Sequence, residues 1–153
     1  MSCYIEVFVR SKSGEFTCIG SFSRNSAIYK CIDDCHCAPW EKVKKIFKQD
    51  ISDIINVATG YIDSYKDYIA ENKAEQELIM TANNSLEEKL EAIRNCQNTF
   101  VEIKEELDEY EHAKDYFYFL SDIISEFFYE DADSLKGLYF GMEIGEPTEE
   151  DIV

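Results

Sequence analysis

The stretch that decides the fold runs from Ser85 to Tyr129 and reads SLEEKLEAIRNCQNTFVEIKEELDEYEHAKDYFYFLSDIISEFFY. Its apolar residues recur every three or four positions, with one gap of seven, which is typical of the buried side of an amphipathic helix. Ser85 and Glu88 form a capping box, in which each side chain bonds a backbone N–H at the start of the helix. The pattern predicts a helix from Ser85 to about Glu130. Its apolar side consists of Leu86, Leu90, Ile93, Cys96, Phe100, Ile103, Leu107, Tyr110, Phe117, Leu120, Ile124 and Phe127.

A second helical pattern precedes this stretch and predicts a helix from Pro39 to about Ala82, with an apolar seam from Trp40 to Tyr68. Pro39 suits the first turn of a helix, where its missing N–H is not needed. The two helices are nearly equal in length and would form an antiparallel hairpin that reaches about 60 Å. The alternative is a compact three-helix bundle in which the second helix breaks near His112. The run at residues 116–119 favours the break, because it is apolar on every side and needs cover all round.

The two ends of the chain carry strand patterns. Apolar and polar residues alternate from Cys3 to Arg10, a turn with Gly14 follows, and Phe16–Phe22 completes a β-hairpin. A short helix is expected from Ser23 to Asp34, and a third strand at residues 137–145 would pair with the hairpin. The prediction is a single α+β domain, mainly helical, on a three-stranded antiparallel sheet. Its parts are 1–38 (β-hairpin and short helix), 39–130 (helical body), 137–145 (strand) and 146–153 (frayed acidic tail).

The charge of the chain is distributed unevenly. The formal net charge is −17 over 153 residues. Residues 1–48 hold eight Lys or Arg and five Asp or Glu, whereas residues 49–153 hold seven and 27. A body this acidic repels nucleic acid, because binding phosphate requires cations that displace its counterions. It attracts basic protein surfaces instead, quickly and in a salt-dependent way.

Carboxylates follow one side of the predicted central helix. Four of them stand at positions i, i+3, i+4 and i+7, which places them in one stripe, and two more extend it towards the start of the helix. Like charges four residues apart cost a few tenths of a kcal/mol each, so the stripe is unfavourable by itself. It is either a solvated helix side or a surface that meets a cationic partner. The stripe consists of Glu102, Glu105, Glu106 and Glu109, extended by Glu88 and Glu91.

A group of thiols at the end of the first short helix is the candidate metal site. Zinc takes about four thiolate or imidazole ligands in a tetrahedron, and this group offers them within seven residues. The usual second pair of ligands is missing, so three ordinary thiols are the simpler interpretation. Nearby lysines and the following helix could also lower a thiol pKa and make it reactive. The candidate ligands are Cys31, Cys35, His36 and Cys37, with Cys3 or Cys18 completing the site.

Catalytic motifs are absent from the sequence. The six glycines are scattered and form no phosphate loop, and there is no nucleophile elbow. No apolar run approaches the roughly 18 residues of a membrane span, and the first residues lack the pattern of a signal peptide. We therefore expect a cytoplasmic protein that is not an enzyme and, apart from the candidate zinc, has no cofactor.

Three functional hypotheses remain. The first is a non-catalytic binding protein whose acidic helix covers a basic surface of a partner, such as a nuclease, by mimicking nucleic acid. In composition the chain resembles small inhibitors and immunity proteins that occlude basic sites. The second is a self-associating scaffold in which the Trp40–Tyr68 seam is shared between copies. The third is a structural zinc protein.

Overall fold

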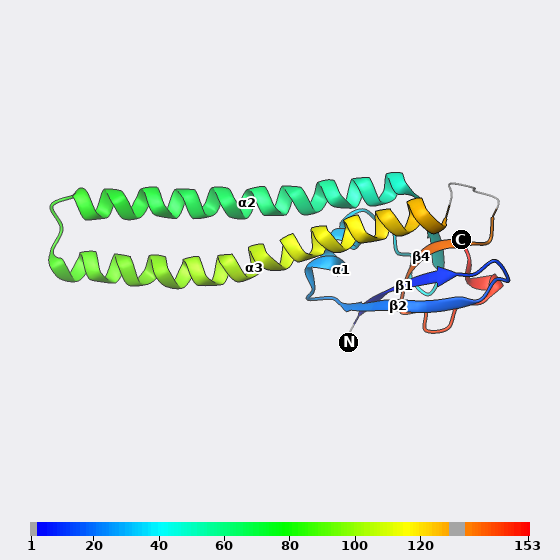
Figure 1. Cartoon of the computed structure of the whole chain (residues 1–153). Coiled ribbons are helices and arrows are strands. Elements are labelled where there is room, and N and C mark those ends of the chain that lie inside the picture. Colours follow the sequence, from blue (N-terminus) through cyan, green and yellow to red (C-terminus); the bar gives the residue numbers. More distant parts are fainter. Residues whose placement is uncertain (1–2, 129–133) are drawn as a thin grey trace.

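The computed structural model describes residues 3–128 and 134–153. Within these residues, three α-helices and a four-stranded antiparallel sheet form a mainly helical α+β fold (Figure 1). The fold class predicted from the sequence is confirmed. The turn expected at residues 131–133 lies outside the described part of the chain. None of the described helices combines the length and the apolar character needed to cross a membrane.

The two long helices α2 (Lys48–Thr81) and α3 (Leu86–Phe127) run antiparallel and project together away from the sheet (Figure 1). The 42 residues of α3 extend over about 63 Å at 1.5 Å per residue. The Ser85 hydroxyl accepts a hydrogen bond from the Glu88 backbone N–H, which is one half of the predicted capping box; the reciprocal bond to the Glu88 carboxylate is not formed in the described structure. Because α3 continues past His112 without a break, the hairpin alternative is correct.

The aromatic run at residues 116–119 does not need the cover that its composition suggested. Phe117 is fully buried, but Tyr118 is 50% and Phe119 is 56% exposed. The run therefore keeps the ordinary two-sidedness of a helix, with one aromatic ring in the core and others in solvent. This removes the physical reason for a break in α3.

The sheet has the strand order β2-β1-β4-β3, and every neighbouring pair is antiparallel. β1 (Tyr4–Arg10) and β2 (Phe16–Ser23) form the predicted hairpin, and β4 (Gly137–Met142) is the predicted third strand. The fourth strand, β3 (Val43–Ile46), was missed, because the sequence pattern placed these residues in a helix that begins at Pro39. Trp40 likewise lies before α2 and bridges to Met142.

Burial on both sides of the sheet explains why β3 is a strand. Val43 packs into a small cluster with Phe8 and Tyr139, whereas Ile46 packs into the main core. Residues three apart in a strand point to opposite sides, so this spacing requires cover on both. Spacing of three is equally typical of a helix, and the sequence alone does not separate the two.

The main core lies between one side of the sheet and the helices. It joins residues of β1 and β4, such as Ile5 and Phe140, with the short helix α1 (Ala27–Asp34) and the bases of α2 and α3. The seam of α2 is filled within the same chain, since Ile51, Ile54 and Ala58 are all fully buried. Trp40 and Tyr68 at the two ends of the seam are each 50% exposed, so a scaffold that shares the seam between copies stays a prediction.

The C-terminal segment covers the other side of the sheet. It contains a short 3₁₀ helix, η1 (Glu149–Asp151), and its Val153 N–H donates to the Val43 carbonyl. Arg10, although only 1% exposed, forms an ion pair with Glu149 and lies over the Phe16 ring. The prediction of a frayed tail is wrong, because the buried guanidinium needs the carboxylate that this segment supplies.

Candidate functional site

The six glutamates predicted as a partner-binding stripe all lie on α3 and are exposed. Successive helical residues are about 100° apart, so Glu102, Glu105, Glu106 and Glu109 fall within an arc of about 100°. None of these four forms an ion pair with a residue that the structure describes. Local geometry therefore brings the predicted stripe together, with its charges facing solvent.

The stripe continues into a surface shared by both long helices. Glu88 and Glu91 line a hollow of about 340 Å³ together with Glu75 and Ile79 of α2. We call this side of the hairpin the acidic face: Glu75 from α2, and Glu88, Glu91, Glu102, Glu105, Glu106 and Glu109 from α3. The contribution of Glu75 was missed, because the pairing of α2 with α3 decides which side of α2 meets the stripe.

A cluster of tyrosines packs between α2 and α3 beside the end of the acidic face that is nearer the sheet. The rings of Tyr61 and Tyr110 stack with centroids 4.5 Å apart, and the Tyr65 ring lies 5.6 Å from Tyr110. Burial raises the pKa of Tyr65 to about 12, and the neighbouring Glu106 carboxylate adds to the shift. The Tyr65 hydroxyl therefore stays protonated at neutral pH.

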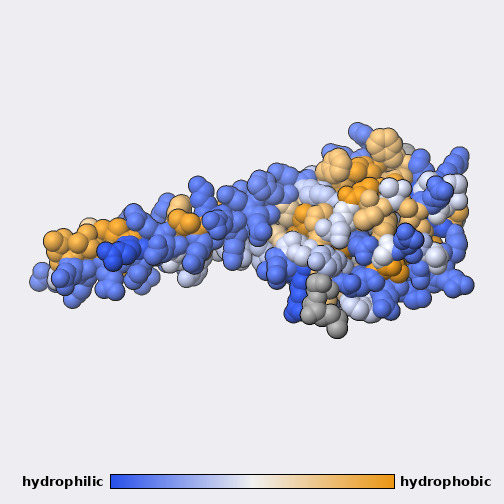
Figure 2. Space-filling view, turned by 90° about the horizontal axis from the view of Figure 1, so that it is seen from below, coloured by the Kyte–Doolittle hydropathy of each residue, from blue (hydrophilic) through white to orange (hydrophobic). Residues whose placement is uncertain are grey.

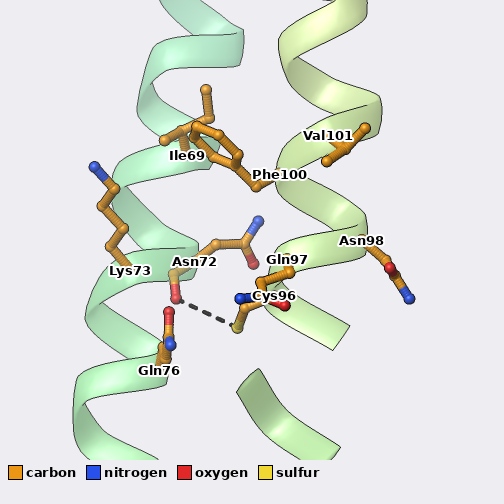
Figure 3. Close-up of a pocket in the computed structure, with 9 residues that line it drawn as sticks. All are labelled: Ile69, Asn72, Lys73, Gln76, Cys96, Gln97, Asn98, Phe100 and Val101. Atoms are coloured by element: carbon orange, nitrogen blue, oxygen red, sulfur yellow. Dashed lines mark hydrogen bonds between the residues drawn. The ribbon is translucent and has the colours of Figure 1, made fainter. Parts of the chain in front are cut away.

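The opposite side of the hairpin has a different character. A hollow of about 530 Å³ is lined there by Ile69, Lys73 and Phe100, among others, and Figure 3 shows its residues. Asn72 and Cys96 line this hollow and also the hollow of about 340 Å³ on the acidic face. The two hollows therefore open on either side of the same contact between α2 and α3. The two sides of the hairpin therefore differ: one carries the acidic face, and the other carries apolar residues with Lys73 and Lys104, beside which Glu77 and Asp108 are also exposed.

The structure does not bring the four predicted metal ligands into one site. Cys31 is fully buried in the main core and Cys37 is 4% exposed, whereas His36 lies on the surface. Within residues 3–128 and 134–153, no group of three or more His, Cys, Asp or Glu side chains is placed to hold a metal ion. Zinc binding stays a prediction, which metal analysis of protein purified without chelators would check.

The same thiols are less acidic than the sequence suggested. Burial raises the pKa of Cys31 to about 12 and that of Cys35 to about 11. Burial also raises the pKa of Cys37. The nearby Lys44 ammonium lowers this pKa, but by less than burial raises it. The expectation that neighbouring lysines produce a reactive thiolate is therefore wrong at neutral pH, because desolvation of the thiol outweighs them.

His36 has a structural role at the end of α1. Its φ of 54° places it in the left-handed region. Its N–H donates to the Asp33 carbonyl and the Cys37 N–H donates to the Ile32 carbonyl. These two bonds form a Schellman motif, which ends a helix and usually has glycine at this position.

We expect His36→Gly to stabilise the protein by about 0.5–1 kcal/mol, because glycine adopts a positive φ without the Cβ clash. The free energy of unfolding in urea measures the gain. His36→Ala is the matched control and should give no comparable gain, since alanine keeps the Cβ. Equal gains from both substitutions would contradict the motif.

Comparisons of this chain with protein families, with curated proteins and with solved structures found no match. The candidate site therefore rests on the geometry of the hairpin. Its two surfaces differ in charge and in polarity.

Proposed function

We propose that this chain is a non-catalytic binding protein whose acidic face docks on a basic surface of a partner protein. The observation that carries the proposal is the separation of charge on the hairpin. The seven exposed glutamates of the acidic face have no lysine among them and form no ion pair with described residues, while Lys73 and Lys104 lie on the opposite side, which also holds Glu77. A merely soluble helix would intersperse the two signs and gain a few tenths of a kcal/mol from each i,i+4 pair.

A partner that handles nucleic acid is the concrete form of this proposal. The stretch from Glu88 to Glu109 spans 21 helical steps, or about 31 Å, and carries six of the carboxylates. This is about one charge every 5 Å, against one every 3.4 Å along a single DNA strand. The acidic face would thus occupy the phosphate-binding groove of a nuclease or a related enzyme as a mimic of nucleic acid.

The strength of such binding would come from many weak contacts. An exposed ion pair contributes about 0.2–1 kcal/mol, so several carboxylates together are needed for appreciable affinity. Charges of this kind mainly raise the association rate and make binding sensitive to salt. Strong salt dependence is therefore the expected signature.

A matched pair of charge-reversal variants tests the proposal. The partner is first captured from the native host at low salt, purified, and titrated with each variant at several salt concentrations. In the test variant Glu102, Glu105, Glu106 and Glu109 become lysine. In the control variant the same change is made at four exposed carboxylates elsewhere on the long helices: Asp63, Asp67, Asp122 and Glu126.

The test variant should bind at least tenfold more weakly than the control, with a shallower dependence of affinity on salt. The control carries the same net charge, so it separates the local stripe from the overall acidity of the chain. Equal losses of affinity in the test and control variants would mean that binding depends on the net charge of the chain and not on the position of the stripe. Unchanged affinity in the test variant would overturn the proposal.

A further inference from the structure

The side of the hairpin opposite the acidic face presents two rows of residues. On α2, Ile69, Lys73, Gln76 and Met80 stand at i, i+4, i+7 and i+11, within about 60° of one another. On α3 a second row stands at i, i+4, i+11 and i+15, which also fall within about 60° of one another. The apolar residues of this second row are well exposed. That second row consists of Leu86 (72% exposed), Leu90 (51%), Gln97 and Val101 (55%).

Between these rows, residues of both helices line the hollow of about 530 Å³. A second hollow of about 450 Å³, which shares Lys73 and Gln76 with the first, continues along α2 alone towards the free end of the hairpin. From Ile69 to Thr81 the groove follows α2 for about 18 Å, or three helical turns. Exposed apolar side chains gather at the free end of the hairpin (Figure 2). We call this surface the apolar groove.

Cations line the rim of the apolar groove, in a chain whose net charge is −17. Lys73 lines both hollows, Lys66 lies two turns before it on α2, and the Lys104 ammonium lies 5.9 Å from the centre of the Phe100 ring. All three lysines are exposed, and none forms an ion pair with a residue in the described part of the chain. The rim also holds two exposed carboxylates, Glu77 in the second hollow and Asp108 one turn after Lys104, so its net charge is positive by one and attracts carboxylates modestly.

The groove also contains an unpartnered donor. The Asn72 Nδ2 atom is buried and has no hydrogen-bond partner, and in Figure 3 it lies between the two helices. A buried donor without an acceptor costs about 1–3 kcal/mol. An occupant that supplies a carboxylate or amide oxygen at this point would recover that cost.

We propose that the apolar groove is the docking site for an acidic amphipathic helix of a partner protein, which would complete a three-helix bundle. The space between two antiparallel helices is filled well by the side-chain ridges of a third. The apolar side of this helix would cover Leu90, Phe100 and Val101, while carboxylates beside it would meet Lys66, Lys73 and Lys104. A second copy of this chain fits less well, since two copies joined by this surface would oppose lysine to lysine.

Two synthetic peptides of 21 residues test the proposal. Both carry leucine at the a and d positions of three heptads, and the flanking positions are glutamate in one and lysine in the other. Fluorescence anisotropy measures binding to the full-length protein, and sedimentation verifies that the peptides and the protein are monomeric. The glutamate peptide should bind, with an affinity that falls as salt rises.

Two variants locate the binding. Leu90→Asp combined with Val101→Asp places charge on the exposed apolar row, and it should weaken the glutamate peptide at least tenfold while circular dichroism stays unchanged. Lys73→Glu combined with Lys104→Glu should reverse the preference of the groove towards the lysine peptide. The variant that reverses Glu102, Glu105, Glu106 and Glu109 should still bind the glutamate peptide, so this test is independent of the acidic face.

Three results would overturn the proposal. The first is no binding of the glutamate peptide by the monomeric protein. The second is binding that the Leu90 and Val101 substitutions leave unchanged, because the peptide would then lie elsewhere. The third is a dimer of the wild-type chain that these substitutions abolish, which would assign the groove to a second copy.

Discussion

Phe117→Ala should lower the free energy of unfolding by about 3–5 kcal/mol, because it removes a large aromatic ring from a close-packed core. Phe117 is fully buried where the base of α3 packs against α1, α2 and the sheet. For a chain of this length each kcal/mol corresponds to about 2–4 °C in Tm, so the variant should melt at least 6 °C below the wild type. Urea and thermal denaturation measure the two quantities.

Phe119→Ala provides the matched control two residues away. The Phe119 side chain is 56% exposed and touches mainly the Tyr116 ring, 6.3 Å away between centroids. Its removal should change stability by less than about 1 kcal/mol, as for most surface substitutions. Similar losses from both variants would mean that the aromatic run is covered on every side, against the structure.

Gly141→Ala should destabilise the protein by about 3 kcal/mol, with a fall of roughly 6–12 °C in Tm. Gly141 pairs with Glu6 of β1 and with Val43 of β3. A Cβ atom there would overlap the backbone carbonyl oxygen of Lys42 and would lie 3.0 Å from Val43 Cγ1. The backbone of the β3 edge would have to move, because no flexible side chain can yield.

The control for this substitution is Gly60→Ala. Gly60 lies within α2, and a Cβ there would meet nothing within 4 Å. Alanine should stabilise the helix by up to about 1 kcal/mol. A neutral Gly141→Ala variant would contradict the pairing of β3 with β4.

The features that the sequence predicted well are those that depend on local periodicity. The capping residues at Ser85 and the alternation in β1 and β4 reflect short-range geometry. The stripe of glutamates follows from helix geometry alone once α3 is continuous. Local pattern was insufficient at Val43–Ile46, where spacing of three suits either a helix or a strand buried on both sides.

Misplaced expectations share one cause, which is that burial is decided by distant segments. The thiols of Cys31 and Cys37 lie in the main core, and the C-terminal residues cover Arg10 instead of fraying. Nothing near these residues in the sequence indicates what packs on them.

The sequence by itself determined two long amphipathic helices and the row of carboxylates on α3, because each follows from residue spacing along one element. It left the hairpin and the compact bundle open. Only the tertiary structure decided which sides of α2 and α3 share a surface. It thereby separated the acidic face from the apolar groove with its lysines. The physical reason is that the contact between the helices fixes their rotation about their own axes, and this rotation assigns every remaining side chain to one surface or the other.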